Sequence, residues 1–164
     1  MPNIIVLSDT HWSQPEAYSP KLGTICEGAD LIVHAGDAVE SFVLEWLQAS
    51  APVHAVVGNC DRRGVRAKWP GLQEFESGGV RFGLLHGHHV NLRDPAAIVG
   101  CFSAEVRFII HGHTHLAAHY EYQGVQIFNP GSLSEPRDER GPSYGKLRVE
   151  NGIVSATHLP FSDL

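Results

Sequence analysis

Six short apolar runs along the chain each end abruptly in a cluster of Asp, Asn, His, Ser or Gly residues. Short apolar runs bounded by turn residues are typical of buried β-strands. The pattern therefore predicts strands over Ile4–Leu7, Leu31–Val33, Val53–Val57, Val80–Leu85, Val106–Ile110 and Val125–Phe128. In open α/β sheets ligands bind beyond the carboxyl ends of the strands, so we expect the polar residues that follow these runs to converge on one site.

Two segments between these strands carry helical patterns. Over Asp37–Ser50 the apolar residues recur at three- and four-residue spacing, and Pro52 ends the pattern. A second helix is predicted over Asp94–Phe102, because Pro follows the first residue and is favoured in the first helical turn. We expect a loop and a short helix within Ser13–Ala29, and a loop over the site at the basic segment Asp61–Pro70.

The last third of the chain is predicted to consist mainly of antiparallel strands. Strands are expected over Ala117–Tyr122, Tyr144–Val149 and Ile153–His158, and Asn151-Gly152 is a strong hairpin signal. The first half alternates strands with helices instead. Together the two halves indicate an α/β fold with two facing sheets and helices outside, in a single domain over residues 1–164.

Composition and charge exclude several classes of protein. A net charge of −6 gives no electrostatic reason to bind long nucleic acids. No apolar stretch approaches the roughly 20 residues that span a bilayer, so no membrane association is expected. Three widely separated cysteines, with no Cys-x-x-Cys pair, are typical of reduced thiols in a cytoplasmic protein.

The residues that follow the predicted strands are of the types that bind divalent metals. Asp9 and His11 are two residues apart, so in an extended chain their side chains would point to the same side, and His113 and His115 repeat this spacing. The carboxylate of Asp37 could bridge two cations through its two oxygens. Seven residues could supply two neighbouring metals with mixed nitrogen and oxygen ligands: Asp9, His11, Asp37, Asn59, His86, His113 and His115.

These residues occur in motifs that resemble, in order, the signature of the calcineurin-like metallophosphoesterases. The motifs are Asp9-x-His11, Gly36-Asp37, Gly58-Asn59-x-Asp61, His86-Gly87-His88 and Gly112-His113-x-His115. A later segment resembles a feature of the small bacterial and archaeal phosphodiesterase branch of that superfamily, namely Asn129-Pro130-Gly131-Ser132. One such motif is weak evidence, but five in order at strand ends are very specific.

The resemblance implies a fold and a chemistry. The fold would be a four-layer α-β-β-α sandwich of two mixed sheets flanked by helices. One metal would be bound by Asp9, His11, Asp37 and His115, and a second by Asp37, Asn59, His86 and His113. The implied reaction is hydrolysis of a small phosphate ester, most simply a phosphodiester, by a hydroxide that bridges the two ions. Manganese is the first expectation for the metal, with iron, zinc, nickel and cobalt as alternatives.

Three positions are candidates for catalysis, namely Asp37, Asn59 and His88. The role of His88 stays open between catalysis and support of the site. Many family members have His where this chain has Cys60, and that His is thought to protonate the leaving group. The chain thus lacks an obvious general acid, a contribution worth roughly 10²–10⁴-fold, and we expect a preference for esters with good leaving groups.

Other residues near the motifs have competing interpretations. Cys60 could be imagined as a phosphatase nucleophile, but Asp61 follows it and would oppose thiolate formation, so a small residue lining the site is preferred. Arg62 and Arg63 either hold the far side of a diester or belong to a solvated loop. His34 lies within an apolar strand and is expected to be a satisfied core or supporting group.

Two other functional classes compete with the phosphodiesterase. The alternative is a non-catalytic protein-binding scaffold, because retromer's phosphoesterase-like subunit resembles this fold and has a weakened metal site. Here every ligand position is present, which favours the enzyme. An amidohydrolase would carry its His-x-His near the first strand, whereas His113-x-His115 comes late. Small members of the family commonly form dimers or tetramers, so a homo-dimer or homo-tetramer is possible.

Overall fold

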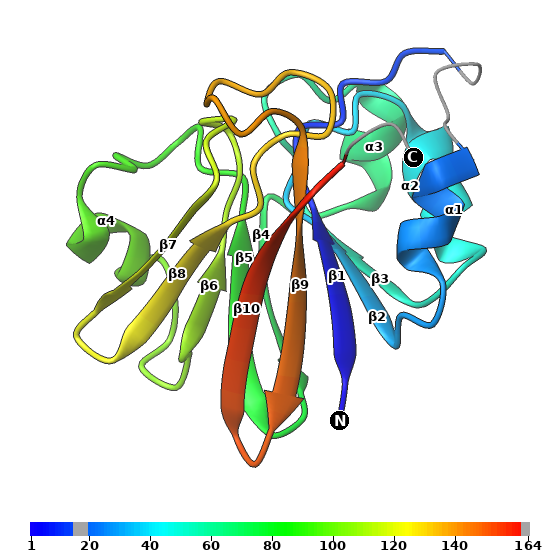
Figure 1. The fold of residues 1–164 in the computed structure, drawn as a ribbon. Helices are drawn as coiled ribbons and strands as arrows, with labels where there is room; N and C mark the ends of the chain where they lie inside the picture. Colours follow the sequence, from blue (N-terminus) through cyan, green and yellow to red (C-terminus); the bar gives the residue numbers. More distant parts are fainter. Residues whose placement is uncertain (15–19, 162–164) are drawn as a thin grey trace.

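The computed structural model describes residues 1–14 and 20–161, which form two facing five-stranded sheets (Figure 1). The first sheet has the order β10-β9-β1-β2-β3 and comprises β1 (Asn3–Leu7), β2 (Leu31–His34), β3 (Val53–Ala55), β9 (Ser143–Glu150) and β10 (Ile153–Pro160). The second has the order β4-β5-β6-β8-β7 and comprises β4 (Leu72–Ser77), β5 (Val80–Leu85), β6 (Phe108–Ile110), β7 (Ala118–Tyr122) and β8 (Val125–Asn129).

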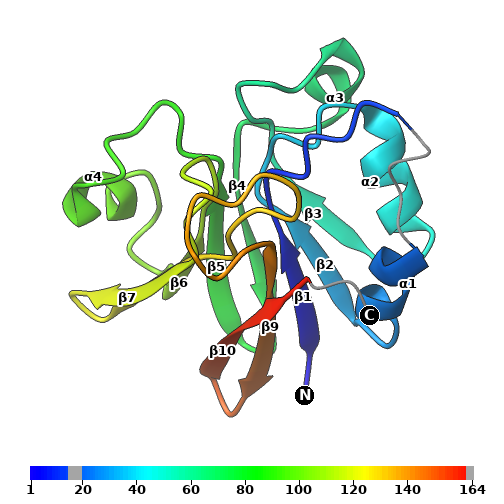
Figure 2. The ribbon, with the colours of Figure 1, turned by 45° about the horizontal axis from the view of Figure 1, so that its top comes forward.

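Both sheets are mixed, and each has a parallel centre. β1, β2 and β3 run parallel, while β9 pairs antiparallel with β1 and β10 with β9. In the second sheet β5, β6 and β8 run parallel, and β4 and β7 pair antiparallel at its two edges. The loops that leave the parallel strands of both sheets gather at one end of the molecule, which is brought forward in Figure 2.

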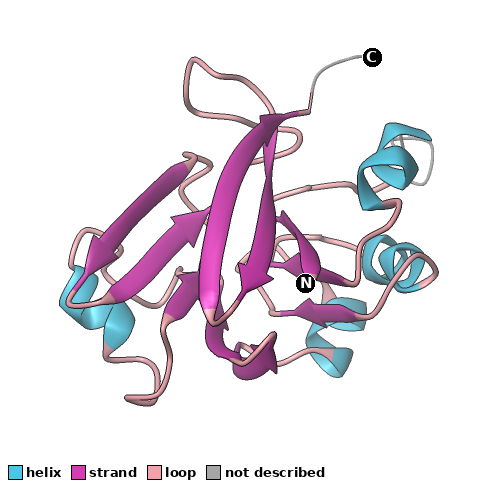
Figure 3. Ribbon diagram, turned by 60° about the horizontal axis from the view of Figure 1, so that its bottom comes forward, coloured by secondary structure: helices cyan, strands magenta, loops and turns pink. Residues whose placement is uncertain are grey.

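Helices cover the outer faces of the two sheets (Figure 3). α1 (Pro20–Cys26), α2 (Ser41–Gln48) and α3 (Arg63–Lys68) lie on the side of β1, β2 and β3, and α4 (Pro95–Val99) lies on the side of the second sheet. The layers are therefore helix, sheet, sheet and helix, which confirms the predicted sandwich.

The core has one apolar layer between the sheets and one under each set of helices. In β1, Ile4 and Val6 pack in the layer between the sheets, and Ile5 and Leu7 pack in the layer that contains α1 and α2. This alternation is the two-residue period of a strand with both faces covered, and it explains the continuous apolar run. Each such buried side chain stabilises the fold by about 1.5–3 kcal/mol.

The structure differs from the sequence prediction in the elements around the second and third strands. The segment Asp61–Pro70 is not a loop throughout, because it contains α3, which is anchored by the buried side chain of Val65. The predicted helix over Asp37–Ser50 begins only at Ser41, since Asp37 and Val39 have φ values of 58° and 78° that no α-helix contains.

Other differences concern edges and ends. The edge strand β4 was not predicted, and its main apolar contact is Phe75 opposite Phe82 of β5. The helix predicted over Asp94–Phe102 is confined to α4, with Asp94 as its N-cap. The short helix expected within Ser13–Ala29 is α1, and residues 15–19 of that segment lie outside the described residues. Within the described ranges, no helix has both the length and the apolar character needed to cross a membrane.

Candidate metal centre

The seven predicted ligands lie at the end of the molecule where the parallel strands of both sheets finish. Asp9 and His11 follow β1, Asp37 follows β2, Asn59 follows β3, His86 follows β5, and His113 and His115 follow β6. Facing loops from the two sheets thus supply one group of side chains. The sequence pattern predicted correctly that these side chains would gather at the carboxyl ends of the strands.

The backbone at these residues is not the extended chain on which the same-side argument relied. Five of the seven residues have a positive φ: Asp9 (52°), His11 (48°), Asp37 (58°), His113 (69°) and His115 (60°). For residues other than Gly this costs roughly 1–3 kcal/mol each and persists only where the surroundings impose it. Two backbone bonds hold the loops after β1 and β2 together, because Asp9 N donates to Gly36 O and His11 N donates to Asp37 O, both at 3.0 Å.

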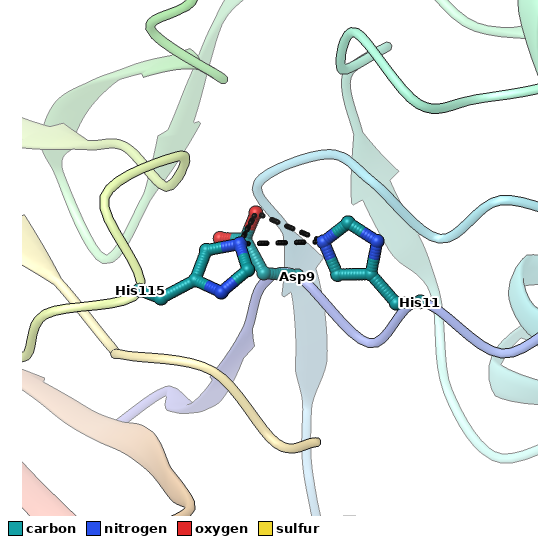
Figure 4. A group of neighbouring side chains, drawn as sticks. All are labelled: Asp9, His11 and His115. Carbon is teal, nitrogen blue, oxygen red and sulfur yellow. Dashed lines mark hydrogen bonds and ion pairs between the residues drawn. The ribbon is translucent and has the colours of Figure 1, made fainter. Parts of the chain in front are cut away.

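One group of side chains consists of Asp9, His11 and His115 (Figure 4). Asp9 Oδ1 lies 3.2 Å from His115 Nε2 and 3.7 Å from His11 Nε2. The two imidazole nitrogens are 3.3 Å apart. Two nitrogens and one carboxylate oxygen therefore point at a common small space.

A second group adjoins the first through Asp37. Its Oδ2 lies 3.3 Å from His86 Nε2 and 3.5 Å from His11 Nε2. Asn59 Oδ1 lies 3.1 Å from the same His86 nitrogen. The ring of His113 stands edge-on to that of His86, with the centroids 5.1 Å apart. Asp37 consequently lies between the two groups.

The donors fit divalent cations. Asp9 is fully buried, and its Oδ1 accepts no hydrogen bond from any described residue. The Nδ1–H groups of His86 and His115 donate to Ala35 O and Glu135 O, each at 2.7 Å. A carbonyl can only accept, so these bonds fix the tautomer and leave the Nε2 lone pairs free for a cation. Imidazole, carboxylate and amide donors together suit manganese, iron and zinc.

The electrostatics of the centre keep its carboxylates ionised. Burial alone would raise the pKa of Asp9, but the nearby imidazoles of His11 and His115 lower it well below the usual range. Burial would likewise raise the pKa of Asp37, and its interaction with His86 outweighs that effect and lowers the pKa. The neighbouring carboxylate of Asp9 raises the pKa of His11 and of His115 in return.

Two residues outside the predicted ligand set hold the loops of the centre in place through hydrogen bonds to the backbone. Asp61 is buried and accepts backbone N–H groups from Asp37, Val39 and Gly58, so it orients the loops after β2 and β3. Ser132 Oγ donates to Asp9 O at 2.7 Å. The segment after β8 is thereby tied to the loop after β1.

Histidines on the inner strands are satisfied groups of the core. His34 is fully buried, accepts Gly36 N–H at Nδ1 and lies 3.2 Å from Thr10 Oγ1 through Nε2. Burial lowers the pKa of His34 to about 4 and that of His111 to about 4. Both imidazoles are therefore neutral near pH 7, and for His34 this agrees with the interpretation of the sequence.

A pocket of about 270 Å³ opens on the centre. Five of the predicted ligands line it, together with Cys60, Glu135 and Arg137. Arg62 is not among the lining residues, and its guanidinium forms an exposed ion pair with Glu40. Arg63 is exposed at the start of α3. His88 is half-buried and lines a neighbouring pocket, with its ring centroid 5.4 Å from that of His86.

Sequence reasoning missed Arg137 because it follows no strand end. It lies in the loop between β8 and β9, where its backbone N–H donates to His115 O at 3.1 Å. The Asn129–Ser132 motif was the available signal, since it anchors the start of that loop at the centre.

Comparison with known proteins identifies a family for this chain, and the similar proteins carry names that agree with that family. The model of the calcineurin-like phosphoesterase superfamily domain matches residues 3–152. A probable metallophosphoesterase of Methanothermobacter thermautotrophicus is 35% identical over 156 residues, which cover 92% of this chain and 88% of that protein. The phosphodiesterase YfcE of Escherichia coli K12 is 32% identical over 115 residues, which cover 65% of this chain and 57% of YfcE.

Solved structures show the same fold. Vps29 of Chaetomium thermophilum has a TM-score of 0.77 at 19% identity, with 96% of each chain covered. The structure of YfcE has a TM-score of 0.70 at 24% identity and covers 98% of this chain and 100% of its own. At these identities the likeness extends to the fold alone.

Proposed function

Because the chain belongs to the calcineurin-like phosphoesterase superfamily, we propose that it is a phosphodiesterase that works with two divalent cations, manganese first among them. The observation that supports the proposal most directly is the environment of Asp9 Oδ1. This buried oxygen accepts no hydrogen bond from the described residues, yet the Nε2 atoms of His115, His11 and His86 lie 3.2, 3.7 and 3.9 Å from it. A cation bound between Asp9, His11 and His115 would satisfy this oxygen and two of those nitrogens at once.

The residues divide into two overlapping ligand sets. Asp9, His11, Asp37 and His115 would hold one cation, and Asp37, Asn59, His86 and His113 the other. When bound, two such ions supply a hydroxide nucleophile at neutral pH and neutralise charge on the phosphoryl oxygens. The position of Asp37 between the two groups supports its role as the shared ligand.

The other polar residues of the pocket would orient the substrate. Arg137 lines the pocket beside the ligands and is the arginine we expect to contact the phosphoryl group first. Arg62 and Arg63, at the start of α3, are proposed to contact the more distant part of a larger ester. His88 is proposed as a catalytic residue beside His86, where burial lowers its pKa and keeps the imidazole neutral.

The proposal also covers the size of the substrate, the location of the protein and its oligomeric state. A small phosphate ester suits a pocket of about 270 Å³ better than a long polymer does. We propose a cytoplasmic location, and a homo-dimer or homo-tetramer remains part of the proposal. The scaffold alternative has the likeness to Vps29 in its favour. The complete set of ligand residues favours the enzyme.

Hydrolysis of model esters tests the proposal. Chelator-stripped protein would be assayed on bis-p-nitrophenyl phosphate and p-nitrophenyl phosphate, with and without added Mn²⁺. We expect activity that depends on the metal, is greater on the diester and is lost in Asp9→Asn. The matched control is Asp94→Asn, at the N-cap of α4. Inactivity with Mn²⁺, Ni²⁺, Zn²⁺ and Mg²⁺, despite measured metal binding, would support the scaffold instead.

A further inference from the structure

A second pocket, of about 350 Å³, adjoins the candidate metal centre and has a mostly apolar lining. It lies beside the loop after β5, and its walls include Gly71, Leu72, Leu85, His86, Val90 and Cys101. His86 belongs to both places, since its Nε2 also lies 3.3 Å from Asp37 Oδ2. One residue of the centre thus also belongs to the lining of the apolar pocket.

The lining of this pocket suits a hydrocarbon group better than a phosphate group. None of the described residues that line it is Asp, Glu, Lys or Arg. Its volume of about 350 Å³ exceeds the roughly 150 Å³ of an apolar cavity that accommodates benzene, and it falls within the usual range of ligand pockets. A hydrocarbon group of at least the size of a phenyl ring would fit.

Two features of the wall indicate that a ligand completes it. Leu72 is 42% exposed although it begins strand β4, and it is one of few large apolar side chains so exposed in the described ranges. His88 also lines the pocket, and its Nδ1 is buried without a hydrogen-bond partner among the described residues. A ligand there would cover apolar surface and could offer an acceptor or donor to that nitrogen.

We propose that this pocket, the apolar subsite, binds the hydrocarbon part of a phosphate-ester substrate whose phosphoryl group lies at the metal centre. The inference rests on the proposed function and narrows it. The substrate class is an ester with an alkyl chain or aromatic ring, in contrast to one with only small polar groups. Specificity would come from Leu72 and its neighbours, while the centre binds what all phosphate esters share.

Binding of alkylphosphonates tests the subsite without any turnover. Mn²⁺-loaded full-length protein would be titrated calorimetrically with methyl-, propyl- and hexylphosphonate. We expect the Kd to fall by roughly fourfold for each methylene group that is buried, until the pocket is full. Equal affinity for all three would overturn the subsite while leaving the proposed function standing. No binding of any phosphonate would overturn both.

Variants place the effect in the pocket. A Cβ added at Gly71 would meet no atom within 4 Å, so the backbone there accepts a side chain and Gly71→Leu is the variant chosen to fill the pocket. We expect it to abolish the preference for hexyl- over methylphosphonate, and we expect Leu72→Gln to reduce that preference. The control is Ile153→Gln. Ile153 is 67% exposed on the β9–β10 hairpin, away from the pocket, and this variant should retain the preference for hexylphosphonate. An unchanged preference for hexyl- over methylphosphonate in both pocket variants would overturn the inference.

Discussion

The carboxylate of Asp61 accepts a hydrogen bond from the backbone N–H of Asp37 at 3.1 Å. The same carboxylate accepts the N–H groups of Val39 and Gly58, each at 2.6 Å. An amide has one acceptor oxygen and would turn its NH₂ toward an N–H donor. We therefore expect Asp61→Asn to lower the free energy of unfolding by about 1–3 kcal/mol and to weaken metal affinity by roughly 10–100-fold. Urea unfolding and a metal titration measure the two effects.

Asp94→Asn is the matched control for this variant. Asp94 accepts the N–H of Ala96 at 3.0 Å as the N-cap of α4, a position where Asn serves about as well as Asp. We expect it to leave both quantities close to those of the wild type. Wild-type stability and metal affinity in Asp61→Asn would contradict the organising role of Asp61.

The position of Asp37 between the two ligand groups predicts a difference in metal content between variants. Asp37 Oδ2 faces His11 on one side and His86 on the other, whereas His115 contacts only the first group. We expect His115→Ala to lose about half of the bound metal and Asp37→Asn to lose most of it and nearly all turnover. Elemental analysis of Mn²⁺-loaded, desalted proteins gives the ratio. Unchanged metal content and full activity in Asp37→Asn would refute the shared ligand.

The placement of the arginines predicts which of them affects substrate binding. Arg137 lines the pocket of the centre, and Arg62 is an exposed partner of Glu40 outside it. Loss of a charged hydrogen bond to phosphate costs about 1.5–3 kcal/mol, so Arg137→Ala should raise KM for bis-p-nitrophenyl phosphate by roughly tenfold or more. Arg62→Ala should change KM less. The reverse order would show that the substrate approaches from α3.

The sequence predicted the parts of this molecule that depend on strand burial. Apolar runs such as Ile4–Leu7 are continuous because both faces of their strand are covered, and the polar residues after them mark the strand ends. The edge strand β4 could not be found in this way. It contains only two apolar residues, Leu72 and Phe75, of which Phe75 alone is buried, and pairing with β5 decides that Phe75 faces the core.

Local conformation at the centre was beyond the reach of spacing arguments. A spacing of two residues placed Asp9 beside His11 for the wrong reason, because both residues are left-handed rather than extended. The loop that contains them is held by hydrogen bonds to residues distant in sequence, such as the bond from Asp9 N to Gly36 O. Arg137 escaped notice for the same reason, since its place depends on how the loop after β8 folds back.

Cys60 predicts a strong dependence on the leaving group. Burial and the carboxylate of Asp37 raise the pKa of Cys60 to about 11, which opposes formation of the thiolate and its use as a nucleophile. We expect nitrophenyl diesters to react much faster than alkyl diesters. Cys60→His should raise the alkyl rate by roughly 10²-fold or more, because it adds a general acid, while Cys60→Ser should not. Equal wild-type rates on the two ester types would contradict this.

His34 predicts how stability depends on pH. Its pKa is lowered from 6.5 to about 4 by burial, despite the opposing carboxylates of Asp61 and Asp9. Below pH 6.5 the unfolded chain binds a proton that the folded protein refuses, so stability is full above that pH and falls as the pH drops toward 4. The loss attributable to this residue should be on the order of 2–3 kcal/mol. Urea unfolding of chelator-treated wild type and His34→Asn between pH 4 and 8 measures it as the difference in slope. Because the asparagine oxygen can still accept the N–H of Gly36, equal slopes would place the titration elsewhere.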